Sequence, residues 1–126
     1  MMHPTLQQAV DEAVATFGPD AVSVVERPDG SVRVTVKDLD LGPGWEPSRI
    51  ELGTVLLTTY PVPAPYPFYL TKGLHRVDGK SVPNLQQVPD QGDTISQLSV
   101  RPLGNQAFAT LPALLLAVVS WLRSIG

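Results

Sequence analysis

The chain has 126 residues, of which 43% are hydrophobic and 17% charged, proportions typical of a globular domain rather than a disordered segment. A formal net charge of −3 excludes the basic footprint of nucleic-acid-binding proteins, and the absence of cysteine excludes disulfides, thiolate metal sites and thiol nucleophiles. The apolar run at 111–122 is shorter than the roughly 20 residues of a membrane span, and the first residues lack a signal-peptide pattern. We therefore expect 1–126 to form a single cytoplasmic domain.

The first predicted element is a helix at Thr5–Phe17. Its apolar residues recur at helical spacing and would form one stripe. Thr5 is expected to be the N-cap, with Gln8 three residues later in the capping-box position. Gly18 and Pro19 are expected to end the helix.

Four strands are predicted after this helix. Ala21–Glu26 and Val32–Val36 flank a turn at 28–31, and in Val32–Val36 valines alternate with polar residues, which indicates one buried face. Arg49–Thr59 is the third strand and Phe68–Thr71 the fourth. Short connections between successive strands predict an antiparallel meander.

A proline-rich crossing joins the third and fourth strands. Because proline has no N–H for a strand ladder, the chain must leave the sheet through the four prolines between 61 and 67 and then return. The rings of Tyr60, Tyr66, Phe68 and Tyr69 are expected to lock this crossing onto the core, with an aromatic binding groove as the alternative. Trp45, in a Gly/Pro loop, is expected to be partly exposed and available to a partner.

The remainder is predicted to be a long irregular loop followed by a helix. Lys72–Asn105 is rich in Gly, Pro, Asn, Gln and Asp, a composition typical of functional loops. Thr110–Ile125 is predicted to be helical, with Thr110 as N-cap and Pro112 in the first turn. The predicted fold class is α+β: an N-terminal helix, a four-stranded antiparallel meander, a long active-site-like loop and a C-terminal helix.

Three segments in this order carry a family resemblance. Tyr66-Pro67-Phe68 would be a crossing after the third strand, Val82-Pro83-Asn84 a turn, and 92–98 a Gly-Asp-Thr-Ile-Ser-Gln-Leu segment before the last helix. Together they resemble the Tyr-Pro-Phe, His-Pro-Asn and Gly-x-Ile-Cys-Leu segments of the ubiquitin-conjugating enzyme (UBC-like) fold family, particularly its divergent bacterial branch. The chain departs from that family in having Val82 in place of histidine, no cysteine, a longer stretch between Asn84 and Ser96, and no further C-terminal helices.

The resemblance implies site residues and partners. Ser96 stands at the position of the nucleophilic cysteine, Asn84 at that of the asparagine that stabilises the oxyanion, and Asp93 or Asp90 would orient or deprotonate an incoming lysine. The implied partners are an activating enzyme and a ubiquitin-like protein, with a target protein as acceptor, and no nucleic acid or membrane is expected. No metal or cofactor is expected, and His75 is expected to be a structural or solvated loop residue.

Three functional interpretations stay open from the sequence. In the first, the natural protein has a cysteine at position 96 that accepts a ubiquitin-like protein and passes it to a target amine, and Ser96 is a Cys→Ser substitution of the kind made to trap a complex. Serine needs an adjacent base to act as a nucleophile, and neither His3 nor His75 is near it in sequence. In the second, the chain is a catalytically inactive UBC-like binding or adaptor module. In the third, it is an unrelated α+β adaptor whose long loop is an interaction surface.

Overall fold

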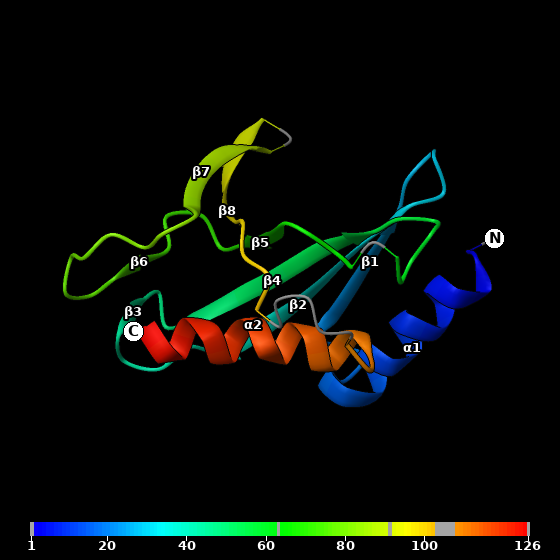
Figure 1. Ribbon diagram of the computed structural model, residues 1–126, viewed down its shortest axis with the longest axis horizontal. Helices are drawn as coiled ribbons and strands as arrows, with labels where there is room; N and C mark the ends of the chain where they lie inside the picture. Colours follow the sequence, from blue (N-terminus) through cyan, green and yellow to red (C-terminus); the bar gives the residue numbers. More distant parts are fainter. Residues whose placement is uncertain (1, 63, 91, 103–107, 126) are drawn as a thin grey trace.

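The computed structural model describes residues 2–62, 64–90, 92–102 and 108–125. It shows an α+β domain with a helix near each end of the chain and strands between them (Figure 1). The elements, in chain order, are α1 (Pro4–Phe17), β1 (Val22–Glu26), β2 (Val32–Asp40), β3 (Trp45–Glu46), β4 (Arg49–Leu56), β5 (Phe68–Leu70), β6 (His75–Arg76), β7 (Leu85–Asp90), β8 (Asp93–Leu98) and α2 (Leu111–Ile125).

The main sheet has six antiparallel strands in the order β1-β2-β4-β5-β8-β7, and β3 pairs with β6 in a separate two-stranded sheet. The prediction of four strands was therefore incomplete. The prediction of one long irregular loop at 72–105 was wrong, because it contains β6, β7 and β8, while 103–105 lie outside the described residues. Residues of modest strand propensity form β7 and β8 because each pairs along its full length around the turn at Gly92.

The hydrophobic core lies between one face of the sheet and the two helices. Alternate residues of β2 (Val32, Val34, Val36) and of β4 (Ile50, Leu52, Leu56) point inward and are at most 2% exposed. They form one cluster with the buried faces of α1 and α2. The predicted period-two pattern of these strands and the apolar stripes of both helices are thus confirmed. Neither of the two described helices lies on the other face of the sheet (Figure 1).

The helix boundaries differ slightly from those predicted. Helix α1 begins at Pro4, and His3 is its N-cap, with Nδ1 accepting a hydrogen bond from the Thr5 amide at 3.3 Å. The prediction of Thr5 as N-cap was therefore wrong, because Pro4 starts the first turn without losing a needed N–H. At α2, Thr110 is confirmed as the cap, because its Oγ1 accepts from the Ala113 amide at 3.2 Å.

Trp45 is buried, in contrast to the expectation of partial exposure. Its side chain is 1% exposed, and its indole N–H donates to the carbonyl of Leu122 near the end of α2 at 3.1 Å. The pairing of Trp45 with Arg76 in the small β3–β6 sheet holds the ring in this place. Strands β3 and β6, which are far apart in sequence, therefore close one end of the core. The glycines and prolines around Trp45 did not indicate that its side chain would be buried there.

The proline crossing is braced at both ends. The Thr54 hydroxyl donates to the Pro67 carbonyl at 3.1 Å, and Phe68 is 1% exposed. The ring of Tyr60 lies 5.8 Å from that of Phe108, while Tyr66 is 45% exposed beneath the Arg101 guanidinium, which lies 4.5 Å from the ring centre. The aromatic residues therefore point in different directions and do not line one groove.

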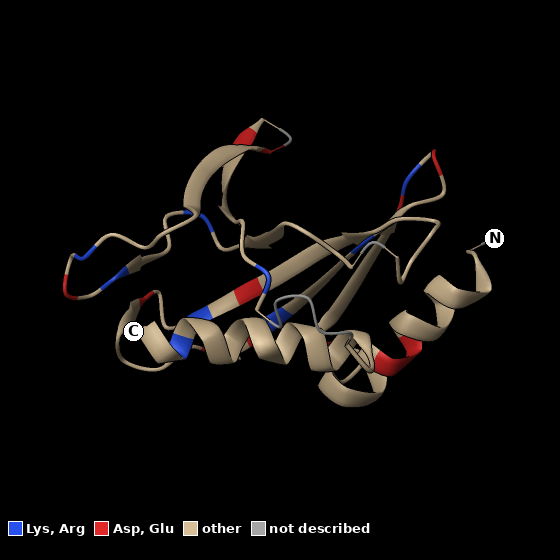
Figure 2. Cartoon of the chain, in the orientation of Figure 1, with Lys and Arg blue, Asp and Glu red and all other residues tan. Residues whose placement is uncertain are grey.

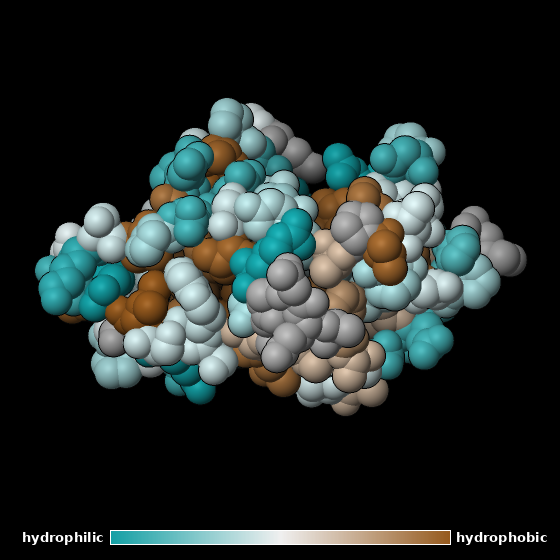
Figure 3. Space-filling model, viewed as in Figure 1, coloured by the Kyte–Doolittle hydropathy of each residue, from teal (hydrophilic) through white to brown (hydrophobic). Residues whose placement is uncertain are grey.

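Exposed hydrophobic residues are scattered over the surface. On the face that Figure 3 shows, brown hydrophobic areas alternate with teal hydrophilic ones. Among the described residues, the large hydrophobic side chains that are exposed are Val25, Leu57, Val62, Tyr66, Val77 and Leu116. Among the described residues, neither helix is both long and apolar enough to cross a membrane.

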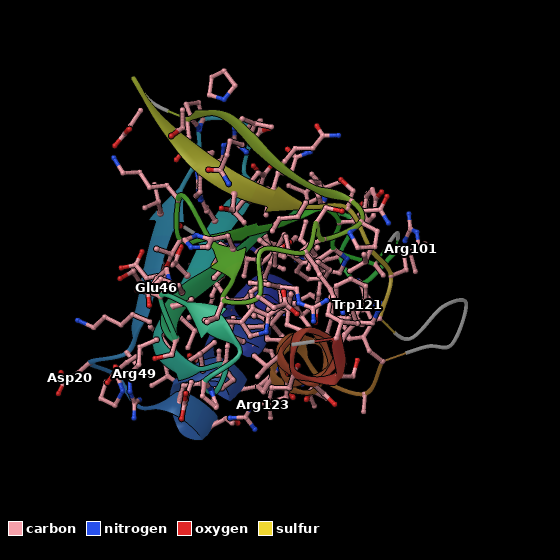
Figure 4. The ribbon with its side chains drawn as sticks, turned by 90° about the vertical axis from the view of Figure 1, so that its left-hand side faces the viewer. Asp20, Glu46, Arg49, Arg101, Trp121 and Arg123 are labelled. Carbon is pink, nitrogen blue, oxygen red and sulfur yellow. The ribbon has the colours of Figure 1, made fainter. Side chains whose placement is uncertain are left out.

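The indole hydrogen bond of Trp45 predicts a measurable loss of stability. Trp45→Phe keeps most of the ring volume but leaves the buried Leu122 carbonyl without its donor, so the free energy of unfolding should fall by about 1 to 3 kcal/mol. Urea denaturation followed by circular dichroism measures this. Trp121→Phe is the matched control, because Trp121 is only partly buried at the edge of the core (Figure 4) and should change stability less. Equal losses would contradict the role given to Trp45.

The environment of Tyr60 predicts a pH dependence. Burial, assisted by the charge of Glu12, raises the pKa of Tyr60 from 10.0 to about 12. Because the folded state holds this proton more tightly, the stabilisation is complete below pH 10 and is lost as the pH rises from 10 towards 12. Urea midpoints between pH 9 and 11.5 should fall more for the natural chain than for Tyr60→Phe. Tyr66→Phe, at an exposed ring, should behave like the natural chain; identical curves for all three would refute the assignment.

Candidate functional site

Ser96 lies inside the main sheet, not in a loop. It belongs to β8, which is inserted between β5 and β7, and its Cα partners are Leu70 and Gln87. Its side chain points to the core face and is 0% exposed. The flanking residues Ile95 and Gln97 are partly exposed and belong to the opposite face.

The Ser96 hydroxyl has its full complement of hydrogen bonds. It donates to the Thr71 carbonyl at 2.7 Å, accepts from the Gln87 amide at 2.7 Å, and accepts from the Leu74 backbone N–H at 3.4 Å. A hydroxyl has one proton and two lone pairs. No lone pair is therefore free to attack a carbonyl, and the residue acts as a buried connection between β5, β7 and β8.

Gln87 extends this network towards the surface. Its side-chain oxygen accepts from the Gly73 amide at 3.0 Å while its NH₂ group reaches Ser96. The Gly73 carbonyl in turn lies 2.8 Å from Nδ1 of His75. His75 is exposed and pairs with Glu46 in the small sheet, as expected for a structural residue, so its ring is engaged locally and is not bonded to the serine.

Asn84 is not brought next to Ser96. It is exposed and has φ 64°, the left-handed conformation that asparagine tolerates in turns. Its carbonyl accepts from the Ser99 amide at 2.9 Å, which places it opposite a residue three positions beyond Ser96, or about 10 Å along the strand. The geometry therefore gives Asn84 a role in starting β7.

The two candidate carboxylates lie at the tip of the β7–β8 hairpin and are engaged in ion pairs. Asp93 is 3.1 Å from Lys72, and the Thr94 backbone N–H with that lysine lowers the pKa of Asp93. A lowered pKa makes a weaker base, and Asp93 is also three residues from Ser96 along the strand. Asp90 pairs with Arg33 of β2 at 3.0 Å. Neither carboxylate faces the serine hydroxyl.

The predicted site residues thus do not converge on one reactive centre. In the part of the chain that the structure describes, no three His, Asp or Glu side chains are grouped in a way that would hold a metal ion. A hollow with a volume of about 1160 Å³ instead lies on the face of the main sheet that neither described helix covers. In the end-on view, β7 and β8 arch over the sheet on the side away from α2 (Figure 4).

An ion pair between Arg33 and Asp90 joins the two sides of this hollow. Arg33 is on β2 and Asp90 ends β7, with three strands between them. In a flat sheet these two strands would be about 19 Å apart, yet the side chains meet at 3.0 Å. The sheet must therefore curl strongly, and the hollow is a concave surface with Tyr69 and Gly53 at its floor.

The sequence prediction missed Arg33 and Tyr69 as members of this surface. The alternation of β2 did place Arg33 on the wet face, and Tyr69 alternates with the buried Phe68 in the same way. The sequence pattern could not predict that Arg33 pairs with Asp90, because the two residues are 57 positions apart in the chain. Comparisons with models of known protein families, with curated proteins and with solved structures give no match to this chain.

The hydrogen bonds of Ser96 predict that removing its hydroxyl lowers the stability of the fold. Ser96→Ala removes the hydroxyl and leaves the Thr71 carbonyl and Leu74 amide without their partner, so the free energy of unfolding should fall by about 1 to 3 kcal/mol. Urea denaturation measures this difference. Ser99→Ala is the matched control; among the described residues its hydroxyl makes a single long contact of 3.5 Å, with Gln97, and the change should stay within about 0.5 kcal/mol. A neutral Ser96→Ala would overturn the structural role.

Proposed function

We propose that the chain is a catalytically inactive, UBC-like binding module that holds a ubiquitin-like protein or its activating enzyme without taking the acyl group. The observation that carries this proposal is the burial of Ser96. A nucleophile in this family must meet the C-terminus of a folded protein, whereas this hydroxyl is 0% exposed and has three hydrogen bonds.

The order of elements supports the relation to the UBC-like fold. An N-terminal helix precedes an antiparallel sheet, a braced Tyr66-Pro67-Phe68 crossing follows β4, a turn at Asn84 comes next, and a helix closes the described chain. The six strands and the paired hairpin at 85–98 go beyond the four-stranded meander. These features favour a binding domain in which the segment around position 96 has become part of the sheet.

The chemistry of transfer also disfavours the enzymatic interpretation. Serine requires a neighbouring general base, and here its proton is already donated to a backbone carbonyl. The side-chain amide that contacts it is a donor, which cannot remove a proton. Acyl transfer at position 96 would require β8 to separate from β5 or β7.

Thiol accessibility tests the central observation without any partner. In Ser96→Cys the thiol should react with Ellman's reagent at least about 100-fold more slowly than in Thr94→Cys, because residue 96 is sealed while Thr94 is exposed on the same strand. Both variants should become equally reactive in denaturant. Rapid labelling of Cys at 96 in the folded protein would refute the closed site.

A charging assay tests the function. The natural chain and Ser96→Cys are incubated with ATP and with the activating enzyme and ubiquitin-like protein of a conjugation pathway from the same organism. Binding of either protein by both forms, with no reducible adduct on the cysteine variant, is the expected result. A reducible adduct would establish the acyl-carrier interpretation instead. Neither binding nor an adduct would overturn the pathway assignment.

A further inference from the structure

The concave face of the sheet carries an excess of positive charge. Its lining includes five Lys or Arg side chains and three Asp or Glu side chains, and Asp93 beside it pairs with Lys72. With Asp93 counted, the face has a surplus of one positive charge in a chain whose net charge is −3. Helix α1, by contrast, carries only acidic charges (Figure 2). The concave face therefore suits a negatively charged partner, and the volume of about 1160 Å³ exceeds the usual range for a small-molecule pocket.

Arg33 is the best-positioned cation on this face. Its guanidinium lies 5.0 Å from the centre of the Tyr69 ring, a cation–π contact that fixes its orientation. Its side chain is 22% exposed, so a carboxylate bound to it is partly removed from water. One carboxylate already occupies this place, because Asp90 from the hairpin tip accepts a hydrogen bond from Nη1 at 3.0 Å.

Aliphatic residues lie beside Arg33 in the neighbouring strands. Val25 of β1 and Val55 of β4 are the Cα partners of Arg33 on either side. Val25 is 58% exposed although it lies within a strand. The face around Arg33 therefore offers apolar surface beside its charged side chains.

We propose that the concave face binds an extended acidic segment of a partner protein, and that Asp90 holds the place of the partner's carboxylate. On binding, a glutamate or aspartate of the segment replaces Asp90 at Arg33, and neighbouring apolar side chains contact Val25 and Val55. Displacing Asp90 raises the surplus of positive charge on this face from one to two. This surface is on the opposite side of the sheet from the Ser96 side chain, and the inference does not depend on a ubiquitin-like partner.

The ion pair provides a matched pair of variants. Arg33→Gln and Asp90→Asn both break the same contact and should cost similar stability, but they should change binding in opposite directions. Arg33→Gln should weaken binding about tenfold or more, because it removes a charge-assisted hydrogen bond. Asp90→Asn should tighten binding about three- to fivefold, because a charged carboxylate at position 90 no longer competes with the bound segment for Arg33.

The experiment uses a capped octapeptide in which glutamate alternates with valine, with isothermal titration calorimetry and backbone amide shifts as readouts. Binding that perturbs β2 and β5, weakens in 0.5 M salt and follows the opposite effects of the two variants is the expected result. Arg101→Gln is the control, since Arg101 contacts Tyr66 on the proline crossing and should leave affinity unchanged.

Three outcomes would overturn the proposal. One is that neither the natural chain nor Asp90→Asn binds the acidic peptide. Another is that a peptide with glutamine in place of glutamate binds as tightly, which would indicate apolar contact alone. The third is that an octamer of thymidine binds equally well and equally depends on Arg33, which would indicate a general polyanion site. Urea denaturation of every variant shows that the comparison is made between folded proteins.

Discussion

The hydroxyl group of Ser96 joins parts of the chain that would otherwise be separate. Strand β8 follows β7 in sequence but lies between β5 and β7 in the sheet. The three groups that the hydroxyl contacts come from the end of β5, the connection to β6, and β7. A buried polar group is stabilising only when all of its hydrogen bonds are made. This one side chain therefore helps to hold the last three strands of the sheet together, in addition to their backbone pairing.

Insertion of β8 has a second consequence, on the far face of the sheet. It extends the sheet by a hairpin whose tip curls back until Asp90 meets Arg33 on β2. The core face is apolar and covered by the two helices, while the outer face is concave and charged and is covered by neither of the described helices. In β8, therefore, the Ser96 side chain lies in the interior, while its neighbours Ile95 and Gln97 are partly exposed on the outer face.

Local sequence patterns predicted the parts of this fold that local forces determine. The period of 3.6 in α1 and α2 and the alternation in β2 and β4 were correct because each reflects burial of one side of an element. Strands β7 and β8 were missed because the pattern of β8 buries a serine with Leu98, so polar and apolar residues do not alternate between faces. The burial of Trp45 and the ion pair of Asp90 could not be predicted, because their partners lie 77 and 57 residues away in the sequence. The resemblance selected position 96, but no pattern in one strand reveals that three distant groups saturate its hydroxyl.

The geometry also bears on whether a cysteine would suit position 96. A thiol is a weak hydrogen-bond donor and a weak acceptor, and sulfur is larger than oxygen. At this position it would have to replace two contacts of 2.7 Å inside a packed sheet. Interiors of this density do not absorb added volume without strain. Serine therefore meets the hydrogen-bonding and packing requirements of this buried position better than the cysteine that the resemblance would place there.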